Sequence, residues 1–287
     1  MNTQDLPESA YAMGRAETET HRLIQQAELV NTFTQRLLEQ AGITAGMKVL
    51  DVGSGAGDVA MLAARLVGPT GSVIGLDANP DILRVARQRC IAAGLPQVTL
   101  LEGDLRTVVL DNDFDAVVGR YVLLYVPDPA QALRSLATHL RPNGVVAFQE
   151  VEMTMVQAYV QARGFPDLAV RTLSWFVDVL QRSGANPAMG FQLYQTYQQA
   201  GLGVPQMEYH ALLGGPTGWA GYDMTAELFR SILPLLEKYG LATAEEVGVD
   251  TLAHRYQAMV AQMEHPFIVS PCVTAWARIG AGANALS

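Results

Sequence analysis

Short runs of apolar, mostly β-branched residues alternate with segments of helical periodicity from Lys48 onward. This alternation implies β-α-β units, whose strands run parallel and are buried on both faces of one sheet. It therefore predicts an α/β fold with right-handed crossovers. The apolar runs are KVLDVG, SVIGLD, VTLLEGD, FDAVVG and GVVAFQE; helices are predicted at 58–67 and 80–93, between the first three runs, and at 128–140, between the last two.

Further helices and two long strands are expected outside this stretch. The segment 18–41 carries one apolar stripe at three- and four-residue steps, and Gly42 ends it. A helical pair inserted between the last two strands would lie over the sheet as a lid. We expect helices at 168–181, 189–200, 223–239 and 244–263, and strands at 204–214 and 266–279. The predicted domains are an N-terminal helical cap (1–45), a core (46–222 and 266–287) and a helical lid insertion (223–265).

The composition favours a compact enzyme that acts on a small molecule. Hydrophobic residues make up 49% of the 287 positions and charged residues 16%, which is enough for a substantial core. A net charge of -9 argues against a nucleic-acid partner, which needs clustered Lys and Arg. Cys90 and Cys272 lack CxxC spacing and the histidines lack metal spacing, so we expect no disulfide framework and no metal site. With no signal peptide or membrane span apparent, we expect a cytoplasmic monomer or homodimer.

The strongest motif is a glycine-rich turn between the first strand and the following helix. Glycines at 53, 55 and 57 remove Cβ atoms and allow positive φ, so that a ligand can approach the backbone at a helix N-terminus. Nicotinamide, flavin and adenosylmethionine binders all use such a turn. Asp51 precedes the glycines, and its carboxylate suits a cationic amino group but would repel a pyrophosphate. The turn therefore favours S-adenosylmethionine over a dinucleotide.

Two more acids close the next two strands. Asp77 is placed to accept both ribose hydroxyls of a nucleoside, a feature that NAD binders share. Asp104 is placed to accept the exocyclic amine of adenine, while Leu105 donates a backbone N–H to the ring. A single Asp at a strand end is more often a helix cap or a turn former. Three in succession behind a GxGxG turn indicate a cofactor site.

These motifs resemble the class I S-adenosylmethionine-dependent methyltransferases, in particular the ubiquinone/menaquinone-biosynthesis branch (methyltransferase type 11/25). The resemblance covers about residues 46–150 through VLDVGSGAGD, GLDANPDIL, EGDL, FDAVVGRYVLLYVPDP and LRPNGVVAFQE. It implies a Rossmann-like, doubly wound sheet of seven strands in the order 3-2-1-4-5-7-6, with strand 7 antiparallel. The start of the chain also resembles a bacterial subgroup in which an N-terminal helix caps the cofactor. That likeness implies that Tyr11, Arg22 and Gln26 lie near the pocket, although a surface helix would account for them equally well.

Together, the residues and the resemblance define the expected site. The residues expected to bind S-adenosylmethionine are Asp51, Gly53, Ser54, Gly55, Asp77, Ala78, Asn79, Gly103, Asp104, Leu105, Arg120, Tyr11, Arg22 and Gln26. Substrate contacts are expected from Tyr121, Tyr125, Gln149, Trp219 and Phe229, and the candidates for a general base are Glu150, His210 and His265. Trp175, Tyr194 and Tyr222 are further candidates for an aromatic acceptor pocket, with an ordinary hydrophobic core as the alternative.

The expected activity is methyl transfer from S-adenosylmethionine to an O, N or C atom of a small-molecule acceptor, in secondary metabolism. The apolar composition of the predicted lid suggests that the acceptor is apolar or aromatic. One alternative is a protein that binds the same cofactor for non-methylating chemistry such as a cyclisation. A NAD-dependent oxidoreductase is disfavoured by Asp51, by the absent GxGxxG and by the lack of a Tyr-x-x-x-Lys pair.

Overall fold

The computed structural model describes residues 17–105, 107, 108, 110, 113–215 and 218–280. For residues 17–28 it describes the backbone alone. The chain divides into two compact units. One unit, called here the sheet unit, contains the described residues of Ala27–Glu150, Met189–Tyr209 and 273–280. The other, called here the helical unit, contains Val151–Ala188, His210–Cys272 and residues 17–26. Each unit is described by itself below.

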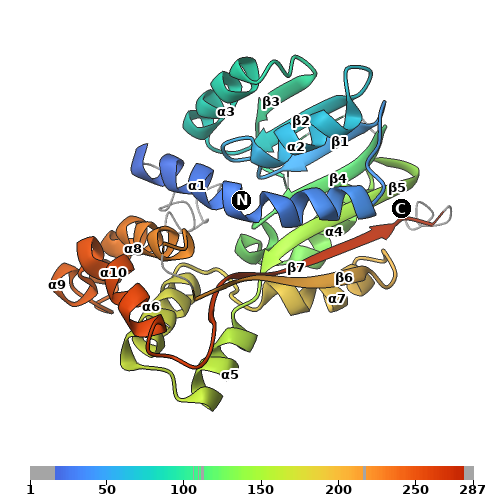
Figure 1. Cartoon of the computed structure of the whole chain (residues 1–287). Coiled ribbons are helices and arrows are strands. Elements are labelled where there is room, and N and C mark those ends of the chain that lie inside the picture. The colour runs from blue at the N-terminus through green and yellow to red at the C-terminus, as the bar shows by residue number, and fades with distance from the viewer. Residues whose placement is uncertain (1–16, 106, 109, 111–112, 216–217, 281–287) are drawn as a thin grey trace. The chain divides into compact units, whose positions relative to one another are not determined.

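Seven strands form one mixed sheet in the order β3-β2-β1-β4-β5-β7-β6, which confirms the predicted order (Figure 1). The strands β1 to β5 pair in parallel, with Asp51 of β1 in register with Gly75 of β2 and Val118 of β4. The bounds are β1 Lys48–Val52, β2 Ser72–Asp77, β3 Val98–Glu102, β4 Phe114–Arg120, β5 Leu140–Val151, β6 Gln206–Gly214 and β7 Phe267–Arg278.

Helices cover the sheet and bury its apolar strands. The residues of α2 (Asp58–Val67) are almost all buried, because the helix packs on the sheet and shares a core with the C-terminal half of α1 (Glu17–Gln40). This core joins Leu38 of α1, Ala60 of α2 and Val49 of β1. The other helical segments of the sheet unit are α3 (Pro80–Ala92), the 3-10 turn η2 (Leu123–Tyr125), α4 (Pro129–Ala137) and α7 (Met189–Gln199).

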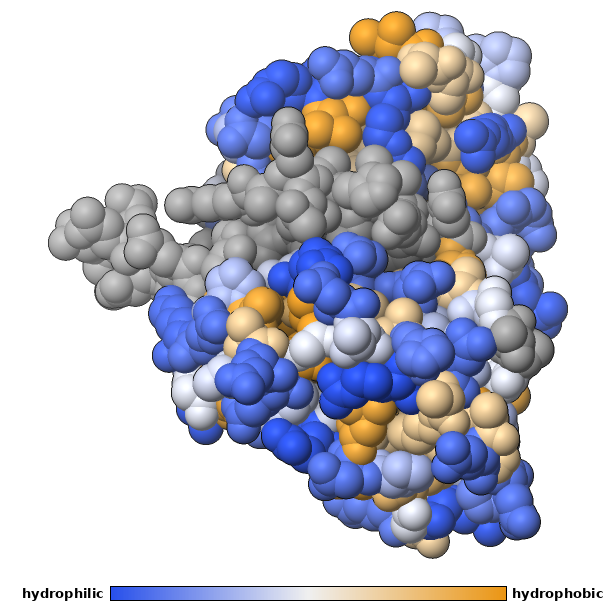
Figure 2. Space-filling view, turned by 60° about the vertical axis from the view of Figure 1, so that its left-hand side comes forward, coloured by the Kyte–Doolittle hydropathy of each residue, from blue (hydrophilic) through white to orange (hydrophobic). Residues whose placement is uncertain are grey.

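The helical unit has its own apolar core, in which α8 (Gly221–Lys238) packs against α10 (Val249–Val260) and α6 (Asp167–Arg182) (Figure 1). The short helices α5 (Thr154–Arg163) and α9 (Ala244–Val247) complete it. Hydrophilic and hydrophobic residues are interspersed over the described part of the face in Figure 2. In the described residues, the helices are each too short or too polar to cross a membrane.

Two local predictions were wrong, and one helix was missed. The helix expected at 128–140 ends at Ala137, and the LRPNG segment belongs to β5, where it forms a bulge between two registered pairs with Asn143 at φ 65°. The single helix expected at 244–263 is two helices, because Gly248 adopts a left-handed conformation (φ 57°) that ends one and begins the next. Helix α5 was not predicted at all.

Candidate functional site

The glycine-rich turn follows β1 directly and is closed by backbone hydrogen bonds. Ser54 N–H donates to the Leu76 carbonyl (2.9 Å) and Gly57 N–H to the Ser54 carbonyl (2.8 Å). Gly53 has φ 64°, and a Cβ built on it would lie 2.4 Å from a methyl carbon of Val122. Any side chain at position 53 would therefore be strained and would displace the loop after β4. Glycine at this position lets the two loops touch.

Asp51 lies beneath this turn with its side chain fully buried. Within the described residues, neither carboxylate oxygen has a hydrogen-bond partner. Burial holds the pKa of Asp51 well above its usual range. The nearby positive charge of Arg120 and the backbone N–H of Ala60, which lies near the carboxylate without forming a hydrogen bond of normal geometry, oppose that shift. A buried carboxylate without partners is unfavourable unless a cation or a donor reaches it. The amino group of S-adenosylmethionine carries both, so this residue fits the cofactor.

The second acid, Asp77, is bound to the same turn. Its Oδ2 accepts the N–H of Gly55 and its Oδ1 accepts the N–H of Asn79, each at 2.9 Å. Burial raises its pKa, and the backbone N–H groups of Asn79, Gly55 and Ala78 oppose the rise. Each carboxylate oxygen has two lone pairs, so both retain capacity for a ribose hydroxyl. Asn79 itself caps α3 by accepting from Asp81 N–H, and the adjacent Ala78 is exposed.

The ends of β2 and β3 lie side by side at this edge. Gly103 N–H donates to the Asp77 carbonyl (3.0 Å), which brings the third acid, Asp104, next to the second. The Asp104 carbonyl accepts from Thr107 and Val108, so a tight turn fixes its backbone. Asp104 and Leu105 are both partly buried. The structure thus gathers the three predicted strand-end acids on one edge of the sheet.

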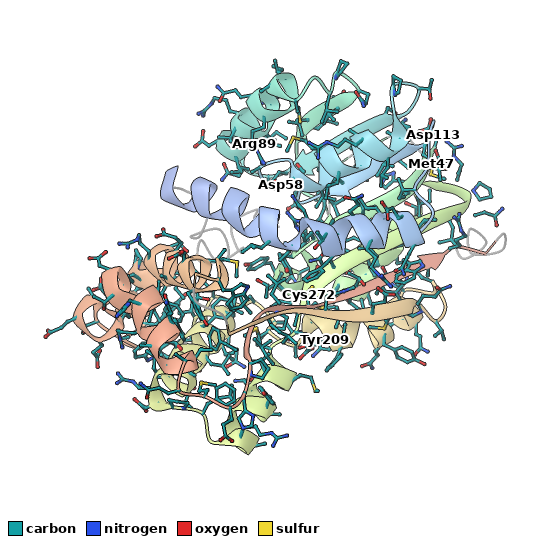
Figure 3. The ribbon with its side chains drawn as sticks, viewed as in Figure 1. Met47, Asp58, Arg89, Asp113, Tyr209 and Cys272 are labelled. Atoms are coloured by element: carbon teal, nitrogen blue, oxygen red, sulfur yellow. The ribbon has the colours of Figure 1, made fainter. Side chains whose placement is uncertain are left out.

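An ion pair fastens the helix that follows the turn. Arg89 of α3 donates to both carboxylate oxygens of Asp58 (2.7 and 3.1 Å) and to the Ala56 carbonyl (2.6 Å). Figure 3 shows the two side chains pointing toward one another. The Asp58 side chain is only 8% exposed. Bidentate pairing of this kind has a defined geometry, so the first turn of α2 is held against α3.

A polar chain connects α1 to the ends of β4 and β5. Arg120 donates to Asn31 Oδ1 (2.9 Å) and to Thr34 Oγ1 (3.0 Å). Thr34 in turn donates to Gln149 Oε1 (2.8 Å), and both of these side chains are buried. Gln149 Nε2 lies 3.4 Å from the Tyr121 hydroxyl. Arg120, expected in the cofactor site, and Gln149 and Tyr121, expected to contact substrate, therefore belong to one network.

Glu150 is fully buried at the end of β5 and binds the loop after β4. Its Oε1 accepts the N–H groups of Val122 (3.0 Å) and Leu123 (2.8 Å), and its Oε2 accepts from Leu124 at 3.3 Å. Burial raises its pKa to about 8, against the effect of these three donors. Glu150 thus fixes the loop that carries Tyr121, at φ 57°, and Tyr125, which is partly buried in η2.

The remaining predicted residues belong to the helical unit or lie outside the described residues. His265 is partly buried in the helical unit, with its ring 6.4 Å from Tyr159 and 6.3 Å from Phe165 between centroids. His210 is a partly buried residue of β6, where the helical unit begins. The helical unit also contains Trp219 and Phe229. Tyr11 lies outside the described residues, as do the side chains of Arg22 and Gln26.

Sequence reasoning missed two residues of the network. Asn31 and Thr34 lie on α1 at 89 and 86 positions from Arg120, and nothing in their local sequence marks them as partners of a strand end. The one available signal was their spacing of three, which places both on the same helix face. Gly75 was also missed: a Cβ there would lie 2.6 Å from a methyl carbon of Leu100 and 3.1 Å from Ser54 Cβ, so a side chain at this position would displace β3 or the turn.

Comparison with known proteins identifies the class. A family model described as a methyltransferase domain matches residues 43–201. The ubiquinone/menaquinone biosynthesis C-methyltransferase UbiE of Ectopseudomonas oleovorans is 34% identical over 152 residues, which are 49% of this chain and 89% of that relative. The relative of the same name from Pseudomonas putida is also 34% identical, and the chain covers 59% of its length.

Solved structures share the fold at low identity. Phosphoethanolamine N-methyltransferase 2 of Haemonchus contortus has a TM-score of 0.59 at 15% identity, covering 96% of this chain and 61% of that one. A methyltransferase of Bacillus halodurans has a TM-score of 0.56 at 18% identity, covering 87% and 99%. The [4+2]-cyclase SpnF has a TM-score of 0.52 at 19% identity, covering 88% and 82%.

The fold and the family match define a class I S-adenosylmethionine-dependent methyltransferase, with S-adenosylmethionine as its cofactor. The chain belongs to the methyltransferase-domain family and resembles the ubiquinone/menaquinone-biosynthesis branch within it.

Proposed function

We propose that this methyltransferase methylates a small apolar or aromatic molecule at a ring carbon. The curated relatives with the same domain are named as C-methyltransferases of ubiquinone and menaquinone biosynthesis, which supports carbon over oxygen or nitrogen as the acceptor atom. A place in secondary metabolism stays a prediction, as does the role of 223–265 as a lid.

The observation that carries the cofactor site is the buried carboxylate of Asp51, whose two oxygens have no partner among the described residues. In this proposal Asp51 accepts the amino group of the cofactor, Asp77 the ribose hydroxyls and Asp104 the adenine amine. Gly53, Ser54 and Gly55 provide backbone against which the ligand packs. When bound, S-adenosylmethionine supplies an electrophilic methyl group on a sulfonium.

The protein's contribution to this chemistry is orientation in a dry site. Glu150 holds the loop after β4, and Gln149 holds the Arg120 side chain through Thr34, so this part of the site is fixed at the ends of β4 and β5. Both oxygens of Glu150 accept backbone N–H groups. Its use as a general base stays a prediction, and so do the same roles for His210 and His265.

Calorimetric titration with S-adenosylmethionine, S-adenosylhomocysteine and NADH tests the site. We expect the two sulfur ligands to bind and NADH not to bind. Asp51→Asn and Asp77→Ala should each weaken the sulfur ligands at least tenfold. Asp81→Asn, the same kind of change at an exposed position of α3, serves as the control and should leave binding unchanged. A preference for NADH, or unaltered binding by both site variants, would refute the assignment.

Turnover then tests the acceptor. Transfer of labelled methyl groups to 1,4-naphthohydroquinone, with the product mapped by NMR, should give a methyl group on a ring carbon. Methylation on oxygen would overturn the choice of atom but not the cofactor site. Cofactor binding with no methyl transfer to any quinol, phenol or amine would favour the non-methylating alternative.

A further inference from the structure

Tyr222, in the first turn of α8, has a buried hydroxyl that the fold does not use. The residue is 3% exposed, and within the described residues its hydroxyl oxygen has no hydrogen-bond partner. Two other tyrosines that are buried in the described part of the chain differ in this respect. Tyr197 donates to the Ala275 carbonyl (2.9 Å) and Tyr256 donates to Thr172. An unpaired buried hydroxyl is unfavourable, and its persistence in a native fold calls for an explanation.

The surroundings of Tyr222 are aromatic and apolar. Its ring meets the Trp219 indole edge to face, with centroids 5.3 Å apart and planes at 89°. In the same core cluster Phe229 meets Trp175 at 6.4 Å. The indole of Trp219 lies against bare backbone, because a Cβ at Gly214 would be 1.9 Å from its ring. Such a set of rings suits a flat aromatic ligand, and the hydroxyl adds one polar contact.

The direction of that contact follows from the chemistry of the phenol. Burial raises the pKa of Tyr222, so the hydroxyl keeps its proton and can donate it in a hydrogen bond. In an apolar cluster, a neutral oxygen is the partner best suited to accept this hydrogen bond, because it brings no buried charge with it. Trp219 is only partly buried and follows Gly218, which has φ 76°. Movement of this one indole is the simplest route by which a ligand would reach the hydroxyl.

We propose that the Tyr222 hydroxyl donates a hydrogen bond to the oxygen of an aromatic acceptor, a phenol, quinol or quinone, seated among Trp219, Phe229 and Trp175. The inference rests on the proposed function, because it names the acceptor class of the same enzyme. It assigns Tyr222 a role in specificity rather than in stability. An acceptor with the same ring and no oxygen would pack equally well and lose the polar contact.

The test compares 1-naphthol with naphthalene, which has the same ring system without the oxygen. Binding is followed by quenching of tryptophan fluorescence and checked by calorimetry. We expect the wild-type chain to prefer 1-naphthol about tenfold, the ratio that one buried hydrogen bond gives. Tyr222→Phe should bring the ratio close to one, with naphthalene binding unchanged. Tyr256→Phe is the matched control, because it removes a paired hydroxyl from the same cluster, and it should retain the preference.

Unfolding by urea supplies the second readout. Tyr222→Phe should be at least as stable as the wild type, since its hydroxyl has no partner to lose, whereas Tyr256→Phe should be less stable. No binding of either probe to the wild type, no preference for 1-naphthol, a preference retained in Tyr222→Phe, or a destabilised Tyr222→Phe would each overturn the proposal. None of these results depends on the cofactor. Failure of S-adenosylmethionine binding with an intact 1-naphthol preference would overturn the proposed function alone.

Discussion

Replacement of Glu150 by glutamine should make the enzyme more stable at alkaline pH. Glu150 is fully buried, and its pKa rises from 4.5 to about 8 because burial disfavours the charged carboxylate more than three backbone N–H groups favour it. Glutamine keeps the shape and the Oε1 acceptor used by Val122 and Leu123. The amide nitrogen then takes the place of Oε2, which has only the long 3.3 Å contact with Leu124.

The sign and the size of the effect follow from proton linkage. Below about pH 4.5 the carboxyl group is neutral in both the folded and the unfolded chain, and its contribution to stability is fully present. Between 4.5 and about 8 only the unfolded chain loses the proton, so the wild-type free energy of unfolding falls by about 1.4 kcal/mol per pH unit. Over the whole window, the loss is on the order of 5 kcal/mol. Glu150→Gln lacks this loss.

Urea unfolding at pH 5 to 9, followed by tryptophan fluorescence, measures the difference between the two proteins. We expect similar stabilities near pH 5 and an advantage for Glu150→Gln that grows up to about pH 8. Glu102→Gln, the same chemical change at an exposed position of β3, is the control for the loss of one surface carboxylate. A difference that stays flat, or that favours the wild type more strongly as the pH rises, would show that Glu150 is ionised in the fold and would refute the reasoning.

Two further changes probe the contacts that hold the site. Thr34→Val should lower the free energy of unfolding by about 1–3 kcal/mol, because Gln149 and Arg120 each lose a buried hydrogen bond, and Thr34→Ser should restore it in the same urea assay. Arg89→Met should lower the free energy of unfolding by about 3 kcal/mol, because it leaves the buried Asp58 carboxylate without its partner. Calorimetry should also show weaker S-adenosylmethionine binding. Undiminished stability and affinity would mean that the ion pair does not hold the turn.

The sequence predicted the parts of the fold that depend on local patterns. The apolar runs located β1 to β4 within about two residues, since a strand buried on both faces needs an unbroken apolar stretch. The strand order came from the family resemblance and not from periodicity, because periodicity says nothing of which strands are neighbours. Helix α5 escaped prediction because only Val156 and Val160 are buried on it, too few for a visible apolar stripe.

In the site, too, the residues that follow from local strand patterns were predictable and the long-range contacts were not. Asp51, Asp77 and Asp104 were predictable because parallel strands end at one edge, so residues that are 26 or more positions apart in sequence meet there. The contacts of Arg120 with Asn31 and Thr34 were not, because they depend on where α1 docks after a chain segment of nearly ninety residues. The partners of Glu150 were equally hidden: they are backbone N–H groups, which every residue carries and no sequence pattern distinguishes.

Asp51 and Glu150 are two buried acids of the sheet unit, and we expect them to have different roles. Burial raises the pKa of both Asp51 and Glu150, so burial alone does not separate a structural acid from a binding acid. Their partners do. Glu150 accepts three backbone N–H groups of the loop after β4, whereas Asp51 has no hydrogen bond of normal geometry within the described residues, and only the nearby Ala60 N–H and Arg120 charge favour its ionised form. A cationic ligand would therefore stabilise the ionised form of Asp51, and the acid that the fold leaves without hydrogen bonds is the one we expect a cofactor to neutralise.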